Sequence, residues 1–267
     1  MLRTVITGAA QEKHSEMKNR YLENLRKIEF VITYACTGRC KHCSEGDHAS
    51  FGVRIDPKIA ADAVNKISSE YDIKTVMTFG GEPLLYTDAV YAVMSAAKDM
   101  RIPKRQVITN GYFSCNADRI KEVASKLSEC GVNDLLLSVD SFHQETIPTE
   151  PVRLFAKEAI AAGIPVRLQP AWLVSAEDNN PYNLMTRQIL DGFSDLGIPV
   201  GCGNVIFPEG NAKRYLSEYF KDVCPENPYE EDPKDVRCVS FSPNGDVLDG
   251  NAYGTDILEI LASYTPR

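Results

Sequence analysis

Short apolar, β-branched runs recur along this chain, and their regular spacing constrains its fold more than any other feature. From Thr75 to Val200 a new run begins about every 30–35 residues, which is the length of one strand and one helix. Helical patterns lie between the runs. The six runs begin near Glu29, Thr75, Arg105, Asp134, Pro165 and Val200. Six such units with right-handed crossovers predict a parallel sheet, either open and doubly wound or curled toward a barrel.

The two ends of the chain depart from this repeat. Apolar residues near the end of segment 1–28 share one helix face, which predicts a helical lead-in. After residue 224 the chain is rich in Pro, Glu and Asp, and the Asn244-Gly245 pair then predicts a β-hairpin over 238–248, followed by a short helix. We therefore expect an N-terminal extension, a sheet-forming domain at 29–223 and a C-terminal accessory extension at 224–267.

Charge and composition narrow the class of partner. Lys and Arg number 29 and Asp and Glu number 37, which gives a net charge of −8. Phosphate backbones and anionic lipid repel such a chain, so we expect neither nucleic acid nor a membrane as its partner. No run of apolar residues is long enough to span a bilayer, and no secretory signal opens the chain. These features predict a cytoplasmic protein, whose eight cysteines stay reduced.

Three of those cysteines, Cys36, Cys40 and Cys43, lie within eight residues with the spacing C-x3-C-x2-C. Three thiolates this close suit a metal ion or an iron–sulfur cluster, and a set of three leaves one coordination position open, as reactive centres require. Three core cysteines on one helix stripe are an alternative, but the glycine and basic residues among them argue against it. A zinc ion with a fourth nearby ligand is the stronger alternative. The candidates for that ligand are Asp47, His42 and His48.

Polar clusters follow each of the first four predicted strands. The cysteine motif follows the first, Gly-Gly-Glu-Pro at 80–83 follows the second, Asn110 ends the third, and Ser138 and Asp140 end the fourth. The carboxyl ends of parallel strands lie at one edge of a sheet, where ligands bind. The sequence therefore predicts that the four clusters build a single site.

This combination of motifs resembles the radical S-adenosylmethionine (SAM) superfamily over about residues 29–207. The resemblance implies a partial (β/α)6, TIM-like barrel. It also implies a [4Fe–4S] cluster held by Cys36, Cys40 and Cys43, whose fourth iron binds the amino and carboxylate groups of SAM.

The resemblance further implies which side chains surround SAM. They are Gly80, Gly81 and Glu82 at the methionine amino group, Ser138 and Asp140 at the ribose or methionine carboxylate, Asn110 in the same pocket, and Val205 and Phe207 against the adenine. His42 stands where the family usually has an aromatic hydrocarbon side chain near the adenine, and an imidazole can stack there as well.

The implied activity begins with an electron from a one-electron reductant such as flavodoxin or ferredoxin. The reduced cluster passes the electron to the sulfonium of SAM, and the 5′-deoxyadenosyl radical that forms takes hydrogen from a substrate C–H bond. Cys115 and Cys202 lie beside the expected active face, and either is a candidate to return a hydrogen atom to the substrate. The alternative is that both are inert thiols. His143, Gln169, Trp172 and Glu209 are further candidates for substrate contact.

The C-terminal segment indicates the class of substrate. Cys238 and the turn after it resemble the start of the SPASM or twitch domain of peptide-modifying members, which predicts a peptide or protein substrate. A further Cys expected after the turn is replaced within 248–251, and Cys224 and Cys238 alone cannot hold a second cluster. We therefore expect a trimmed extension without an auxiliary cluster. A small-metabolite substrate is one alternative, and a non-catalytic, zinc-stabilised α/β binding protein is another.

Overall fold

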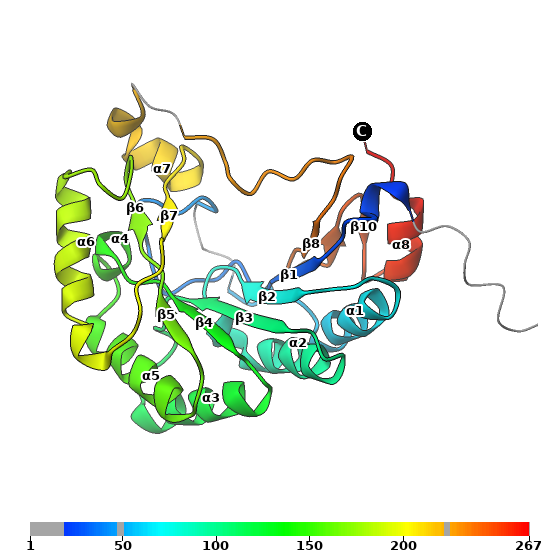
Figure 1. Ribbon diagram of the computed structural model, residues 1–267, viewed down its shortest axis with the longest axis horizontal. Helices are drawn as coiled ribbons and strands as arrows, with labels where there is room; N and C mark the ends of the chain where they lie inside the picture. The colour runs from blue at the N-terminus through cyan, green and yellow to red at the C-terminus, as the bar shows by residue number, and fades with distance from the viewer. Residues whose placement is uncertain (1–18, 47–50, 222–224, 267) are drawn as a thin grey trace, which may run out of the picture.

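The computed structural model describes residues 19–46, 51–221 and 225–266. Its centre is a six-stranded, all-parallel sheet with the strand order β5-β4-β3-β2-β1-β8 (Figure 1). The strands are β1 (Lys27–Val31), β2 (Thr75–Phe79), β3 (Lys104–Thr109), β4 (Asp134–Leu137), β5 (Val166–Leu168) and β8 (Cys238–Phe241).

Helices cover one face of this sheet, and the opposite face is open (Figure 1). The covering helices are α1 (Pro57–Glu70), α2 (Thr87–Asp99), α3 (Ala117–Glu129) and α5 (Thr149–Ala161), and α6 (Pro181–Asp191) continues the layer. Side-chain caps fix where they begin: Asp56 accepts hydrogen bonds from two backbone N–H groups of α1, and Asn116 accepts one from α3. The core lies between the layers, with Phe30 and Val107 of the sheet buried against Val64 and Val93 of the helices.

A second, two-stranded parallel sheet extends the wall beyond β5. It pairs β6 (Ala171–Trp172) with β7 (Asn204–Val205), and an isolated bridge from Leu168 to Val200 links it to the main sheet. The predicted partial (β/α)6 barrel is thus confirmed as a mixed α/β fold with a parallel six-stranded sheet. The strands of the described residues do not close into a barrel.

The sixth strand of the main sheet differs from the expected one. The run near Val200 supplies only the short strand β7, whereas β8 from the C-terminal segment pairs with β1 in parallel. Burial explains the choice, because Phe241 of β8 is fully buried and stacks on Phe30 with ring centroids 4.7 Å apart. The hairpin predicted over 238–248 about Asn244-Gly245 is therefore wrong. A different, shorter hairpin pairs β9 (Asp246–Val247) with β10 (Gly250–Asn251), and the predicted short helix follows as α8 (Ile257–Ser263).

The N-terminal lead-in also differs from expectation in its described part. Residues 1–18 lie outside the described residues. The segment that follows forms a single 3₁₀ turn, η1 (Arg20–Leu22), and Ile28 belongs to β1. Leu22 and Leu25 still enter the core, so their apolar character reports burial and not a helix. The boundaries between segments 1–28, 29–223 and 224–267 stay a prediction.

Candidate functional site

Four loops at the carboxyl edge of the sheet hold one another by backbone and side-chain hydrogen bonds. Glu82 N–H, after β2, donates to Ala35 O at the start of the cysteine loop over 2.8 Å. Asn110 N–H, after β3, donates to the Glu82 carboxylate over 2.9 Å, and Ser138 N–H, after β4, donates to Thr109 O over 2.9 Å. The structure therefore brings the four predicted polar clusters together.

The cysteine loop is irregular, so its three thiols do not form a helix stripe. Cys36 and Cys40 are each 7% exposed and Cys43 is half-buried. Two N–H donors point at the Cys36 sulfur: Gly38 N lies 3.3 Å away and Asn110 Nδ2 lies 3.5 Å away. Hydrogen bonds to sulfur are a feature of Fe–S sites, where they stabilise thiolate charge.

Burial decides the protonation of these thiols. It raises the pKa of Cys36 to about 11, with the nearby Glu82 carboxylate adding to the effect, and it also raises the pKa of Cys40 and Cys43. A bound metal is what makes thiolates favourable in such a place, because its positive charge compensates theirs. Two buried thiols and one half-buried thiol on one short loop, with N–H donors to the first, fit a [4Fe–4S] cluster.

Gly80 and Gly81 make room for the cysteine loop itself. A Cβ atom on Gly81 would lie 2.0 Å from Ala35 O, and one on Gly80 would lie 2.6 Å from Thr33 O. Gly80 also has φ +139°, which few side-chain-bearing residues adopt. The resemblance implied that these glycines lie at the methionine amino group of SAM. In the structure the position of a Cβ on either glycine is taken by the protein's own backbone.

Glu82 is fully buried, and hydrogen bonds surround its carboxylate. It accepts from Leu84 N at 2.9 Å, from Thr109 Oγ1 at 2.7 Å and from Asn110 N. Burial raises its pKa to about 7 despite these hydrogen bonds. In this structure Glu82 holds the loops after β2 and β3 together.

Asp140 has a similar position at the end of β4. Its Oδ1 accepts from the backbone N–H groups of Phe142 and His143 and so caps the short helix α4 (Ser141–Gln144), while Oδ2 accepts from Ala171 N at 3.0 Å and lies 2.8 Å from His143 Nδ1. Burial acts to raise the pKa of Asp140, but His143 outweighs it and lowers that pKa to about 2. Asp140 thereby fixes His143.

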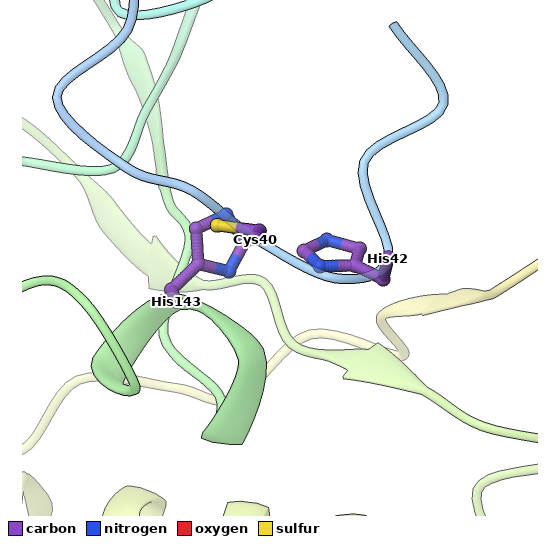
Figure 2. Close-up of side chains that lie close together, drawn as sticks. All are labelled: Cys40, His42 and His143. Atoms are coloured by element: carbon purple, nitrogen blue, oxygen red, sulfur yellow. The ribbon is translucent and has the colours of Figure 1, made fainter. Parts of the chain in front are cut away.

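Two imidazoles lie beside the second cysteine. Figure 2 shows Cys40, His42 and His143 close together, and one ligand atom of each lies within 4.8 Å of the others. The His42 ring also contacts the Phe142 ring, with centroids 5.1 Å apart. Burial lowers the pKa of His42 to about 4, helped by His143, so its ring is neutral at pH 7. The resemblance implied that His42 lies near SAM, whereas no feature of the sequence placed His143 beside Cys40.

A further residue that the sequence did not indicate braces the cysteine loop from α7 (Gly210–Tyr215). Asn211 N–H donates to Cys43 O over 2.8 Å, and Asn211 Nδ2 donates to Cys40 O over 3.2 Å and to Gly46 O over 3.3 Å. Gly210 lets α7 approach this closely, because a Cβ there would lie 2.2 Å from Ser44 O. No local signal distinguishes this Gly-Asn pair from an ordinary turn.

The remaining predicted residues lie farther out on the molecule. Cys115 and Cys202 are exposed. Val205 is 37% exposed on β7, and Phe207 packs edge to face on Tyr229 with centroids 6.1 Å apart. Asp47, His48 and Cys224 lie outside the described residues. Cys238 is half-buried at the start of β8, where burial and then Glu29 raise the pKa of its thiol.

Known proteins place this site in a family. The model of the Radical SAM superfamily matches residues 30–167. Proteins named "Probable GTP 3',8-cyclase" are related: the one from Methanocaldococcus jannaschii is 29% identical over 129 residues, covering 48% of this chain and 41% of that protein. The one from Saccharolobus islandicus (strain L.S.2.15 / Lassen #1) is 26% identical over 224 residues, covering 78% of this chain and 68% of that protein.

Solved structures share the fold at low sequence identity. Streptococcus suis SuiB bound to S-adenosylmethionine has a TM-score of 0.57 and 12% identity, covering 91% of this chain and 67% of that one. Native anSMEcpe with bound AdoMet has a TM-score of 0.54 and 12% identity, covering 87% and 76%. With the family model spanning the cysteine loop and all four clusters, this chain belongs to the Radical SAM superfamily and is an enzyme that uses a [4Fe–4S] cluster and S-adenosylmethionine.

Proposed function

We propose that this enzyme abstracts hydrogen from a C–H bond of a small polar metabolite, which binds on the open face of the sheet. The peptide substrate expected from the C-terminal segment is not confirmed. The named relatives are cyclases of GTP, a small molecule, which supports the alternative. This chain spans only 41% of the length of the Methanocaldococcus jannaschii relative. A nucleotide substrate is therefore part of the proposal, and it is the first substrate class to test.

In this proposal Cys36, Cys40 and Cys43 hold the cluster. When bound, the cluster and SAM together supply a 5′-deoxyadenosyl radical, and a reductant must provide one electron; flavodoxin or ferredoxin stays the prediction for it. The protein holds the cysteine loop in place. Asn110 and Gly38 donate hydrogen bonds to the Cys36 sulfur.

The SAM contacts expected from the sequence are also part of the proposal, with roles that the geometry refines. The carboxylates of Glu82 and Asp140 are occupied by hydrogen bonds within the protein. We therefore assign them to shaping the backbone of the SAM pocket at 80–82 and 138–140. The N–H groups of Gly81, Glu82 and Ser138 donate within the protein, so the carbonyl groups of these segments are the ones proposed to meet the ligand.

The open face of the sheet has the polarity that a small metabolite requires. Ile28 and Phe30 of β1 pack into the core under the helices, so the alternating residues Lys27 and Glu29 project from the other face. They form an ion pair there. This ion pair makes the amino-terminal half of the open face polar, whereas the cysteine loop follows the carboxyl end of β1. A substrate that extends from the cysteine loop along this face would need hydrogen-bonding groups to replace the lost solvent.

A second polar group on the same face surrounds Asp134. Its carboxylate accepts from Gln106 Nε2 at 2.7 Å and from Arg167 Nη2 at 2.8 Å, and Lys104 Nζ lies 3.0 Å away. Arg167 keeps 39% of its side chain exposed. It therefore offers N–H donors, which suit an anionic or carbonyl group of the substrate.

The single observation that carries this proposal is the relationship to the named cyclases over the matched segment. The test uses anaerobically reconstituted protein with SAM and dithionite, and it measures 5′-deoxyadenosine by mass spectrometry. We expect the low-molecular-mass filtrate of a cell extract to stimulate its formation severalfold over background, with purified GTP as the first single compound. Stimulation only by the retained peptide and protein fraction would contradict a small-metabolite substrate.

A further inference from the structure

Cys40, His42 and His143 are arranged as the ligands of a single metal ion. One ligand atom of each lies within 4.8 Å of the other two. In a tetrahedral zinc site with the usual bond lengths, sulfur and nitrogen ligands are about 3.3–3.6 Å apart. Side-chain shifts of about 1 Å would therefore close the three groups around one ion.

His143 is already oriented for such a role. Its Nδ1 lies 2.8 Å from Asp140 Oδ2, and Asp140 itself is fully buried and held by three backbone N–H groups. Histidines that bind metals usually donate their second ring N–H to a carboxylate in this way, which fixes the ring and its tautomer. The hydrogen bond to Asp140 leaves Nε2 as the atom that can bind a metal.

His42 supplies an independent indication that a metal ion binds here. Its Nδ1 atom is buried and has no hydrogen-bond partner in the described structure, although a buried polar atom without a partner costs about 1–3 kcal/mol. The His42 and His143 rings face each other edge to face, with centroids 4.9 Å apart (Figure 2). A metal ion bound between the two rings would give this nitrogen a partner.

We propose that the protein without its iron–sulfur cluster binds one divalent transition-metal ion through Cys40 Sγ, His42 and Nε2 of His143. One thiolate and two imidazoles suit Zn²⁺, Co²⁺ or Fe²⁺, and a fourth position stays available for water. Cys40 releases its thiol proton to solvent when the ion binds. Because Cys40 is also a proposed cluster ligand, the mononuclear ion and the [4Fe–4S] cluster exclude each other.

Cobalt titration of the full-length, cluster-free protein under anaerobic conditions tests this inference. We expect one Co²⁺ per chain, with the visible absorption of a tetrahedral site and a thiolate-to-cobalt charge-transfer band. His42→Phe should weaken cobalt binding at least tenfold and still take up iron and sulfide on reconstitution. His143→Asn keeps a donor for Asp140 but lacks Nε2, and it should weaken cobalt binding to a similar degree while circular dichroism reports an intact fold.

The cysteines separate this site from the cluster site. Cys36→Ala and Cys43→Ala should keep the cobalt spectrum and lose the cluster, Cys40→Ala should lose both, and the exposed Cys115→Ala should keep both. Loss of the cobalt bands in Cys36→Ala or Cys43→Ala would overturn the proposal in favour of a three-cysteine ion. Unchanged cobalt affinity in both His42→Phe and His143→Asn would also overturn it. Cluster content, measured separately as iron and sulfide, shows whether the proposed cluster ligands fail independently of this site.

Discussion

At the scale of single residues, the glycines after β2 show how closely the site depends on backbone packing. Gly81 N–H donates to Thr33 O over 2.8 Å, and the space where a side chain would begin is filled by Ala35 O. The cysteine loop therefore rests directly on the backbone of this turn. Any atom added at Gly81 must push the loop away from the other three loops.

Gly81→Ala should consequently disturb the cluster site. The added methyl would lie 2.0 Å from Ala35 O, and such overpacking costs about 1–3 kcal/mol of folding free energy. We expect iron and sulfide content after reconstitution to fall severalfold. Gly254→Ala is the matched control, because a Cβ there meets nothing within 4 Å. Equal cluster content in the two variants would show that the close contact does not position the loop.

Asp134 should contribute stability that depends on pH. Burial acts to raise the pKa of Asp134, but hydrogen bonds from Arg167 and Lys104 outweigh it and hold that pKa below its usual range. The native protein therefore binds a proton here less readily than the unfolded chain does. The stabilisation is present above the unfolded pKa of about 4 and is lost as the pH falls below it.

Asp134→Asn should therefore lower the free energy of unfolding at neutral pH by about 1 kcal/mol, a modest value because both cationic partners are partly exposed. The fall of stability below about pH 4 should become shallower in the variant. Urea unfolding at several pH values measures both effects. An acid loss as steep as that of the parent protein would contradict the assigned role.

At the scale of secondary-structure elements, α7 clamps the cysteine loop from a distant part of the chain. Buried Asn211 satisfies two carbonyl groups of the loop with its side chain. Asn211→Ala removes both side-chain hydrogen bonds; Cys40 O keeps the Cys43 N–H, whereas Gly46 O loses the Asn211 donor. The loss of a hydrogen bond costs about 0.5–1.5 kcal/mol. We expect the reconstituted cluster to lose iron to a chelator severalfold faster. Asn24→Ala, which removes an exposed hydrogen bond to Asp235, should lose iron at the parent rate.

The elements also show what the sequence could predict. Strand–helix spacing and the polar residues after four strands predicted the parallel sheet and the meeting of four loops, because both depend on local order along the chain. The place of β8 did not follow, since its short apolar pattern beside the Asn244-Gly245 turn suits a hairpin equally well. Its parallel pairing with β1 depends on the burial of Phe241, which is a property of the assembled core.

The candidate site likewise contains residues that the sequence predicted and residues that it did not. The three cysteines could be predicted as ligands because they lie within eight residues of one another in the sequence. The approach of His143 to Cys40 and of Asn211 to the cysteine loop joins segments that are far apart in sequence. The hydrophobic periodicity of the sequence does not predict such contacts. They arise from the register of the strands and from the close approach that Gly81 and Gly210 permit.

At the scale of the whole molecule, the cluster should couple binding to folding. A group that binds only the folded chain stabilises it by an amount that grows with the logarithm of the group's concentration relative to its Kd. We expect reconstituted protein to unfold at higher temperature than cluster-free protein under the same anaerobic buffer. The difference should vanish in Cys36→Ala and persist in Cys115→Ala, whose thiol is exposed. Equal midpoints with and without bound iron would contradict this coupling.

No described helix is both long and apolar enough to cross a bilayer. Flavodoxin and ferredoxin stay the predicted electron donors. An anaerobic assay that replaces dithionite with reduced flavodoxin or ferredoxin compares the two candidates directly.

The pairing of β8 with β1 links the timing of synthesis to the completion of the sheet. β1 spans Lys27–Val31 and β8 spans Cys238–Phe241, in register from Lys27 beside Cys238. While a ribosome is still making the middle of the chain, one edge of β1 has no neighbour and presents free amides and carbonyls. Pairing of β8 with β1 ends that exposure. Nascent chains arrested before residue 238 should therefore be the ones that aggregate and depend on chaperones.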